Sequence, residues 1–212
     1  MKVDIWSDVR CPFCYIGKRK FEAALEKFAH KDEVEIEWHS FELDPDAKTD
    51  PNINVYDYLA EKKGQTREWA VQMHEHVSHS AAEAGLQFNF DKVVMANSFH
   101  AHRLIQLAKS YGLDNEVEEL LFSAYFIDGK NIDDKAVLKE IGLAAGIEEI
   151  VVSQMLANYD FSNEVRADEQ IAQQIGISGV PFFIFNQKLA VSGAQAPETF
   201  LGAMEQAWAA LV

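Results

Sequence analysis

The alternation of apolar and polar residues predicts strands near both ends of the chain. Residues 2–7 form a short apolar stretch that we expect to be the first strand. Val34, Ile36 and Trp38 alternate with polar residues, which indicates a second, half-buried strand. Residues 182–185 are continuously apolar, as expected of a strand buried on both faces, and residues 188–192 are predicted to pair with them after a turn.

Helical periodicity dominates the rest of the chain. Apolar residues recur at helical spacing from Gly17 to Lys31 and predict an amphipathic helix. Between about residues 55 and 158 nearly every segment is predicted to be helical, with helices ending near Gly112, Gly129 and Gly146. Two more helices are expected at residues 163–175 and 200–211.

The order of these elements predicts an α/β fold, namely a thioredoxin fold interrupted in its middle. Strand, helix and strand come first, and helix, two strands and helix come last. Residues 1–52 and 159–212 would form a discontinuous thioredoxin-like domain, and residues 53–158 an inserted all-helical domain. Because an insertion of that size is too long for a connection, we expect it to form a small core of its own.

Composition narrows the possible functions. The chain has 212 residues, of which 48% are hydrophobic, so a sizeable core is expected. Its net charge of −15 argues against a nucleic-acid or anionic-membrane partner, since phosphate binding needs clustered Lys and Arg. No apolar run approaches the roughly 20 residues of a membrane-spanning helix. The first residues lack the features of a signal peptide, so we expect a cytoplasmic protein.

Cys11-Pro12-Phe13-Cys14 is the motif that carries the chemistry, because these are the only two cysteines. A C-x-x-C pair between a strand and a helix is typical of thioredoxin-like redox sites. The first cysteine would lie at a helix N-terminus, where unpaired N–H groups and the helix dipole favour the attacking thiolate. A zinc site is the alternative, but it needs four ligands, and the chain has no second C-x-x-C.

Residues around the motif leave alternatives open. Asp8 could relay protons to the resolving thiol or could accept N–H groups in a turn. Arg10 could favour the thiolate or be a surface charge. His74 and His76 would point apart on a helix, and His76 and His79 could share a face, but two ligands do not complete a metal site, so we expect no metal.

Three motifs in order resemble those of DsbA-like oxidoreductases. They are Ser7 to Gly17 around the cysteines, Asn97 to Leu104, and Ser178-Gly179-Val180-Pro181-Phe182-Phe183. The best match is the cytoplasmic FrnE-type branch, which is related to 2-hydroxychromene-2-carboxylate isomerase and kappa-class glutathione transferases.

The resemblance assigns roles to individual residues. It implies that Cys11 is the nucleophile and Cys14 the resolving cysteine. It also implies that Val180 and a cis Pro181 face them and hold a bound thiol or peptide. The isomerases and transferases place a serine where Cys11 stands, which favours a redox role here.

We therefore expect a thiol–disulfide oxidoreductase with no bound cofactor. Its partner would be glutathione or another thiol- or disulfide-containing peptide or protein, and the sequence leaves the oligomeric state open. A glutathione-dependent isomerase or transferase, and a redox-switched peptide-binding module or chaperone, are the alternatives. Phe13 would lie beside the reactive sulfur, and Asn97 or His100 would line a groove above Cys11 and influence substrate choice.

Overall fold

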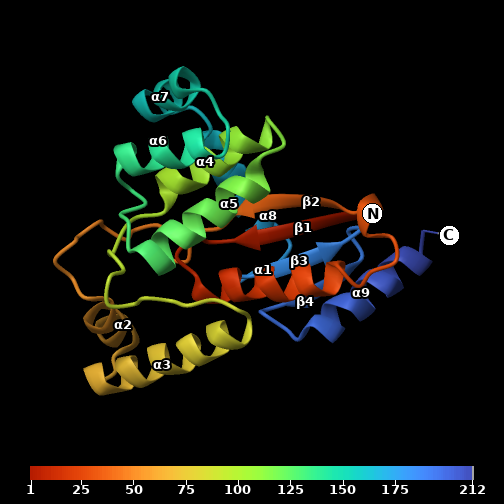
Figure 1. The fold of residues 1–212 in the computed structure, drawn as a ribbon, viewed down its shortest axis with the longest axis horizontal. Helices are drawn as coiled ribbons and strands as arrows, with labels where there is room; N and C mark the ends of the chain where they lie inside the picture. Colours follow the sequence, from red (N-terminus) through yellow and green to blue (C-terminus); the bar gives the residue numbers. More distant parts are fainter. Residues whose placement is uncertain (212) are drawn as a thin grey trace.

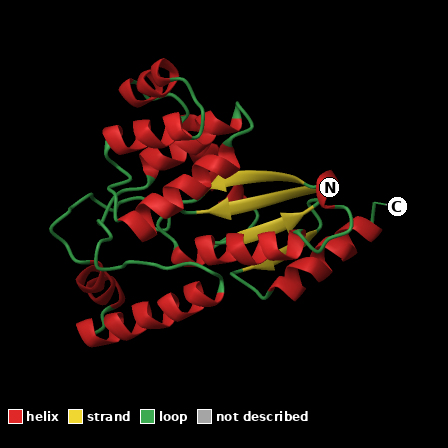
Figure 2. Cartoon of the chain, in the orientation of Figure 1, coloured by secondary structure: helices red, strands yellow, loops and turns green. Residues whose placement is uncertain are grey.

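A computed structural model describes residues 1–211, and within them four strands form one sheet in the order β2-β1-β3-β4 (Figures 1 and 2). β1 (Lys2–Ser7) pairs in parallel with β2 (Glu35–Ser40) and antiparallel with β3 (Phe182–Phe185). β4 (Leu189–Ser192) pairs antiparallel with β3. The predicted strands at the two ends of the chain thus share one sheet, and the predicted thioredoxin-type α/β fold is confirmed.

One face of the sheet packs against α1 (Pro12–Leu25) and α9 (Pro197–Ala209) (Figure 1). Because side chains alternate along a strand, Val3 and Ile5 of β1 point to this face, and both are fully buried. Phe183 and Phe185 of β3 share the same core and contact aromatic side chains of the two helices.

The opposite face is covered by α8 (Ser162–Gln174). Trp6 of β1 packs there with two buried apolar residues from α8 and the loop that follows it, and Phe182 and Ile184 pack against this group. β3 is therefore covered on both faces, as its apolar run predicts, although Phe182 and Ile184 are only half-buried.

The first helix differs from its predicted range of residues 17–31. It begins at Pro12, directly after Cys11, and ends at Leu25. Proline is suited to the first helical position because its missing N–H would have no partner there. Phe28, the last residue of the predicted apolar stripe, reaches the core from a turn beyond the helix and contacts Trp208. A short 3-10 turn, η1 (Lys31–Glu33), follows.

The helices between β2 and α8 form two groups on either side of the end of α1 that carries Cys11 (Figure 1). The first group is α2 (Val55–Lys63) and α3 (Arg67–Glu83). The second group lies beside β2 and consists of α4 (Phe99–Lys109), α5 (Asp114–Ser123), the π-helical turn η2 (Ala124–Asp128), α6 (Lys135–Ala144) and α7 (Glu149–Ala157). The predicted domain boundaries fall in the loops before α2 and after α7.

The insertion does not build the separate core that its length led us to expect. Leu104 of α4, Leu121 of α5 and Ile141 of α6 belong to the same buried cluster as Val3 and Phe21. The physical reason is that α4 and α5 pack directly on β2, so that sheet and insertion share their apolar surface. Within residues 1–211, none of the helices combines the length and the apolar character that a bilayer crossing requires.

Candidate active site

Cys11 and Cys14 lie at the N-terminus of α1, where the sequence predicts them. Cys11 is the N-cap residue, and the backbone N–H of Cys14 donates to the Cys11 carbonyl at 3.0 Å. Both are free thiols, and both are buried. Cys11 therefore lies at the unpaired peptide N–H groups and at the positive end of the helix dipole.

Val180 and Pro181 face Cys11 from the loop before β3. The Val180–Pro181 peptide bond is cis, as the resemblance implies. The Cys11 Sγ lies 3.5 Å from the Val180 carbonyl oxygen. Gly17 allows this approach, since a Cβ atom there would lie 2.9 Å from the Pro181 Cγ. The structure thus brings Cys11 against Val180 and the cis Pro181, as the resemblance implies.

A cavity of about 420 Å³ opens beside Cys11. Its wall comes from the loop before α1, from α2 and α3, and from η2, which contributes Tyr125 and Phe126. Phe13 lies at this cavity with 42% of its surface exposed, so it is where the sequence predicts it. The remaining wall is mostly apolar and includes Val55, Leu59, Trp69, Met73, Val77 and Phe90.

Asp8, fully buried three residues before Cys11, accepts backbone hydrogen bonds in its loop. Its Oδ1 accepts from the Arg10 N–H at 3.1 Å, and its Oδ2 accepts from the Leu43 N–H at 2.8 Å. Burial alone would raise the pKa of Asp8, but His102 and these N–H groups outweigh it and lower that pKa. Asp8 is thus an ionised side chain that accepts N–H groups in a turn, which is one of the two roles that the sequence leaves open for it.

Ser7, at the end of β1, contacts a buried carboxyl group that the sequence did not indicate. Glu118 of α5 accepts a hydrogen bond from the Ser7 hydroxyl at 2.6 Å, and the Ser7 side chain also acts to lower the pKa of the Cys14 thiol. Burial raises the pKa of Glu118 to about 7, despite the Ser7 bond and the nearby His102. Burial, and then the neighbouring Cys11, raises the pKa of the Cys14 thiol well above its usual value.

His102 of α4 joins Asp8 and Glu118 in this region. Its Nε2 lies 3.5 Å from Asp8 Oδ1, and neither ring nitrogen makes a hydrogen bond of good geometry. Burial would lower the pKa of His102, but the surrounding carboxylates raise it. We call Ser7, Asp8, Glu42, His102 and Glu118 the cysteine-side cluster. Glu42 pairs with Arg166 through one oxygen, while its other oxygen is buried without a partner.

Asn97 and His100 do not line the cavity, so the geometry does not support their predicted position above Cys11. The Asn97 amide donates to the Ala47 carbonyl at 3.0 Å, and its oxygen accepts from the Phe99 N–H at the start of α4. The His100 Nδ1 lies 3.0 Å from Arg103 Nη1. The α4 side chain that reaches the cysteine side is His102.

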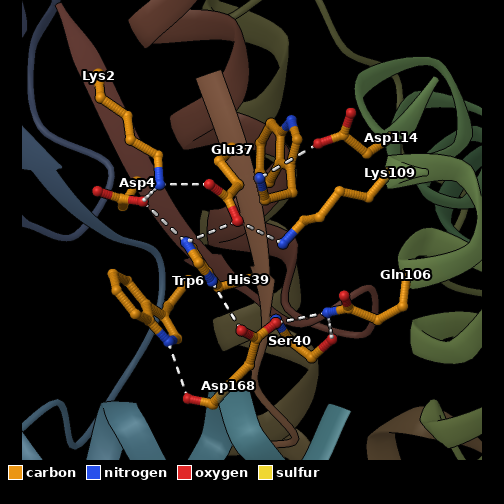
Figure 3. Close-up of polar contacts among 11 residues, drawn as sticks. Lys2, Asp4, Trp6, Glu37, His39, Ser40, Gln106, Lys109, Asp114 and Asp168 are labelled. Atoms are coloured by element: carbon orange, nitrogen blue, oxygen red, sulfur yellow. Dashed lines mark hydrogen bonds and ion pairs between the residues drawn. The ribbon is translucent and has the colours of Figure 1, made fainter. Parts of the chain in front are cut away.

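A second buried polar group joins β1 and β2 to α4 and α8 (Figure 3). His39 of β2 lies between two carboxylates, with its Nδ1 2.8 Å from Asp168 Oδ1 and its Nε2 3.0 Å from Asp4 Oδ1. The second oxygen of Asp168 accepts from the Ser40 N–H at 2.9 Å and from the Gln106 amide at 2.5 Å. We call this the sheet–helix network; it comprises Lys2, Asp4, Glu37, His39, Ser40, Gln106, Lys109 and Asp168.

Part of the sheet–helix network has the spacing of a metal site, but its chemistry does not fit one. One ligand atom each of Asp4, Glu37 and His39 lies within 4.8 Å of the others. However, Lys2 pairs with both carboxylates, and the Lys109 ammonium lies 2.9 Å from Glu37. Burial would lower the pKa of His39, but Asp168 and Asp4 raise it, so the imidazole favours protons over a metal.

The sequence matches the DSBA-like thioredoxin domain over residues 2–205. The chain belongs to this family. Among solved structures, a probable DsbA oxidoreductase from Streptomyces coelicolor is 38% identical and superposes with a TM-score of 0.92. The similarity covers 99% of this chain and 90% of that one.

Two further structures share the fold of the family at low identity. The cytosolic disulfide reductase DsbM from Pseudomonas aeruginosa is 16% identical, with a TM-score of 0.65, over 100% of this chain and 97% of its own. A 2-hydroxychromene-2-carboxylate isomerase is 14% identical, with a TM-score of 0.67, and the match covers 100% of this chain and 96% of the isomerase chain. At these identities the likeness shows the fold alone. Membership of the DSBA-like family and the similarity to the Streptomyces oxidoreductase support an enzyme of the oxidoreductase kind.

Proposed function

We propose that the chain is a thiol–disulfide oxidoreductase that forms a mixed disulfide at Cys11. One observation carries the proposal: Cys11 caps α1 beside Pro181, and Cys14 is buried one turn behind it. The Cys11 thiolate attacks a substrate disulfide, forms the bond to one sulfur and releases the other as a thiolate. Cys14 then attacks the Cys11 sulfur and releases the second thiolate.

The electrons balance without any further group. The substrate disulfide gains two electrons and becomes two thiols, while the protein pair loses two and becomes the Cys11–Cys14 disulfide. An external thiol, such as glutathione, would return the protein to its reduced form by the reverse exchange. A structure of the fold relative DsbM with glutathione makes this tripeptide a reasonable partner to test. We propose that this exchange takes place in the cytoplasm.

Cys14 needs a base, because its pKa is raised and a thiol is a poor nucleophile. Glu118 is suited to that role, since its pKa of about 7 lets it accept a proton near neutral pH. The Ser7 hydroxyl, which donates to Glu118 and influences the pKa of Cys14, would carry the proton from the Cys14 sulfur to the Glu118 carboxylate.

The test compares Cys11→Ser and Cys14→Ser in insulin disulfide reduction and in adduct trapping. We expect Cys11→Ser to abolish turnover and to trap nothing. Cys14→Ser should accumulate a mixed disulfide at Cys11, because the resolving thiol is gone. If Cys11→Ser kept the wild-type turnover, or if it accumulated adducts on Cys14, the assignment of nucleophile and resolver would be wrong.

A glutathione-dependent isomerase or transferase is the second candidate, because the cavity beside Cys11 has the size of a small-molecule site and the fold matches an isomerase. In that case Cys11→Ser would keep its activity on a small organic substrate with glutathione, while insulin reduction would be absent in the wild type.

A further inference from the structure

The cavity beside Cys11 carries a cation, Arg10, that forms no salt bridge with a carboxylate among the described residues. Arg10 directly precedes Cys11 and lines the cavity. Its Nε is buried without a hydrogen-bond partner, and its guanidinium lies 5.6 Å from the centre of the Tyr58 ring. The two carboxylates of the cavity wall are engaged elsewhere, since Asp44 pairs with Lys62 and Asp8 faces His102. Arg10 is therefore available to an anion.

The charge of the cavity differs in sign from that of the whole chain. Its wall holds three cationic side chains, Arg10, Lys62 and Lys63, against two carboxylates, Asp8 and Asp44. The chain as a whole has a net charge of −15. Because the surrounding protein repels anions, a locally cationic cavity indicates that an anionic group is bound there specifically.

The rest of the cavity favours an apolar ligand. Three large apolar side chains at the cavity remain exposed, namely Phe13 at 42%, Leu43 at 47% and Met73 at 37%. Exposed apolar side chains that gather at one cavity commonly mark a binding site. The volume of about 420 Å³ lies within the range of small-molecule sites, roughly 300–1,000 Å³.

We propose that this cavity selects a small organic disulfide with an aromatic or alkyl body and an anionic group that Arg10 binds. This inference rests on the proposed function and names its substrate class. The reduced enzyme donates two electrons: Cys11 bonds to one substrate sulfur, the other sulfur leaves as a thiolate, and Cys14 displaces the second thiolate. The anionic group meets the guanidinium of Arg10, while the apolar body contacts Met73 and its neighbours.

The test measures the single-turnover oxidation of the pre-reduced protein by three disulfides. Dithiobis(nitrobenzoate) is aromatic and carries a carboxylate on each ring, dithiodipyridine is aromatic and neutral, and bis(hydroxyethyl) disulfide is small and polar. The variant Arg10→Met removes the charge but keeps the apolar stem, and Lys188→Met is its control at an exposed site remote from the cavity. Met73→Gln removes the apolar contact, with Ile150→Gln, at another exposed apolar residue, as its control.

In Arg10→Met, the rate of oxidation by the carboxylated disulfide should fall about tenfold or more relative to the rate with the neutral aromatic one. This is the effect expected when a hydrogen bond to a charged group is lost. This ratio cancels any general effect of Arg10 on the Cys11 thiolate. In Met73→Gln, the rates of oxidation by both aromatic disulfides should fall by about threefold or more relative to the rate with the polar one, because apolar contact area is lost. Both control variants should keep the wild-type ratios.

The outcomes separate the inference from the function on which it rests. If none of the three disulfides oxidises the Cys11–Cys14 pair, the proposed oxidoreductase function fails. If all three do so, but Arg10→Met and Met73→Gln leave both ratios unchanged, the function stands and the substrate class is wrong. A wild-type preference for glutathione disulfide over the carboxylated aromatic disulfide, after correction for their rates with free glutathione, would also overturn the inference.

Discussion

The two buried polar groups of this protein differ in how completely they are paired. In the sheet–helix network, both ring nitrogens of His39 and both oxygens of Asp168 have partners. In the cysteine-side cluster, His102 has no hydrogen bond of good geometry and Glu42 has an unpaired oxygen. Buried polar groups normally have hydrogen-bond partners, so the unpaired groups of the cysteine-side cluster lower the stability of the fold, whereas the paired groups of the sheet–helix network do not.

The difference matches what each group touches. The sheet–helix network joins β1 and β2 to α4 and α8 (Figure 3), and none of its residues lines the cavity beside Cys11. The cysteine-side cluster includes Ser7, whose side chain acts to lower the pKa of Cys14. A paired network fixes how the insertion sits on the sheet, whereas groups with unused hydrogen-bonding capacity and shifted pKa values are typical of sites that move protons.

The largest expected effect is on stability, from Asp168→Asn. The amide removes a charge that faces His39, and its NH2 group must replace one of the two oxygens, which accept from His39 or from Ser40 and Gln106. We expect the free energy of unfolding to fall by about 3 kcal/mol, as when one partner of a buried pair is lost. Chemical denaturation measures this, and the exposed Glu205→Gln is the control.

The same variant should exchange disulfides at nearly the wild-type rate while it remains folded. If Asp168→Asn were as stable as the wild type, or if it lost exchange activity without losing stability, the structural role assigned to the sheet–helix network would be wrong.

The next effect is kinetic and lies in the cysteine-side cluster. Glu118→Gln can still accept the Ser7 hydrogen bond but cannot take a proton. We expect the step in which Cys14 resolves the mixed disulfide to slow about tenfold or more, since general bases contribute large factors. Rapid quenching of the mixed disulfide measures this step, and Glu116→Gln, exposed on the same helix, is the control.

The pH dependence sharpens this prediction. In the wild type the resolving step should slow as the pH falls below about 7, because Glu118 is then protonated. The glutamine variant should lack that titration. An unchanged pH profile in Glu118→Gln would show that another group takes the Cys14 proton.

Stability should respond to Glu118 in the opposite sense from activity. Its folded pKa of about 7 lies above the usual 4.5, so the unfolded chain loses this proton first as the pH rises. The folded state is therefore destabilised between these two values, and the loss persists at higher pH. Glu118→Gln should remove this loss, so that the variant is at least as stable as the wild type at pH 8.

Local signals account for the parts of the site that the sequence predicts correctly. The C-x-x-C spacing is a short motif that specifies its own geometry, whereas the position and the cis bond of Val180-Pro181 follow from the resemblance of that segment to the family. Glu118 carries no such signal, because it lies in a run of polar and apolar residues typical of a solvated helix face. Its burial depends on how α5 packs on the sheet, more than 100 residues after Ser7.

The expectation for Asn97 and His100 fails for a related reason. The segment from Asn97 to Leu104 does include the start of α4, but the side chains predicted to face Cys11 are not the ones that point toward the sheet. Successive helical residues are rotated by about 100°, so a shift of two positions changes which side chain points inward. His102 and Gln106 face the sheet, and Asn97 instead ties the loop at Ala47 to the helix start.

The smallest expected effect is the pH dependence that His39 gives to the sheet–helix network. The pKa of His39 is raised above its usual 6.5, because the bonds to Asp168 and Asp4 outweigh burial. Its contribution to stability is therefore fully present below pH 6.5 and is lost as the pH rises through the folded pKa. His39→Gln should be less stable than the wild type in mildly acidic buffer, and the difference should shrink in alkaline buffer. Urea unfolding across this range measures it, with the exposed His76→Gln as the control. A difference that grows with pH would mean that His39 is neutral in the folded protein, so that the sheet–helix network, like the cysteine-side cluster, would hold a buried carboxylate short of a partner.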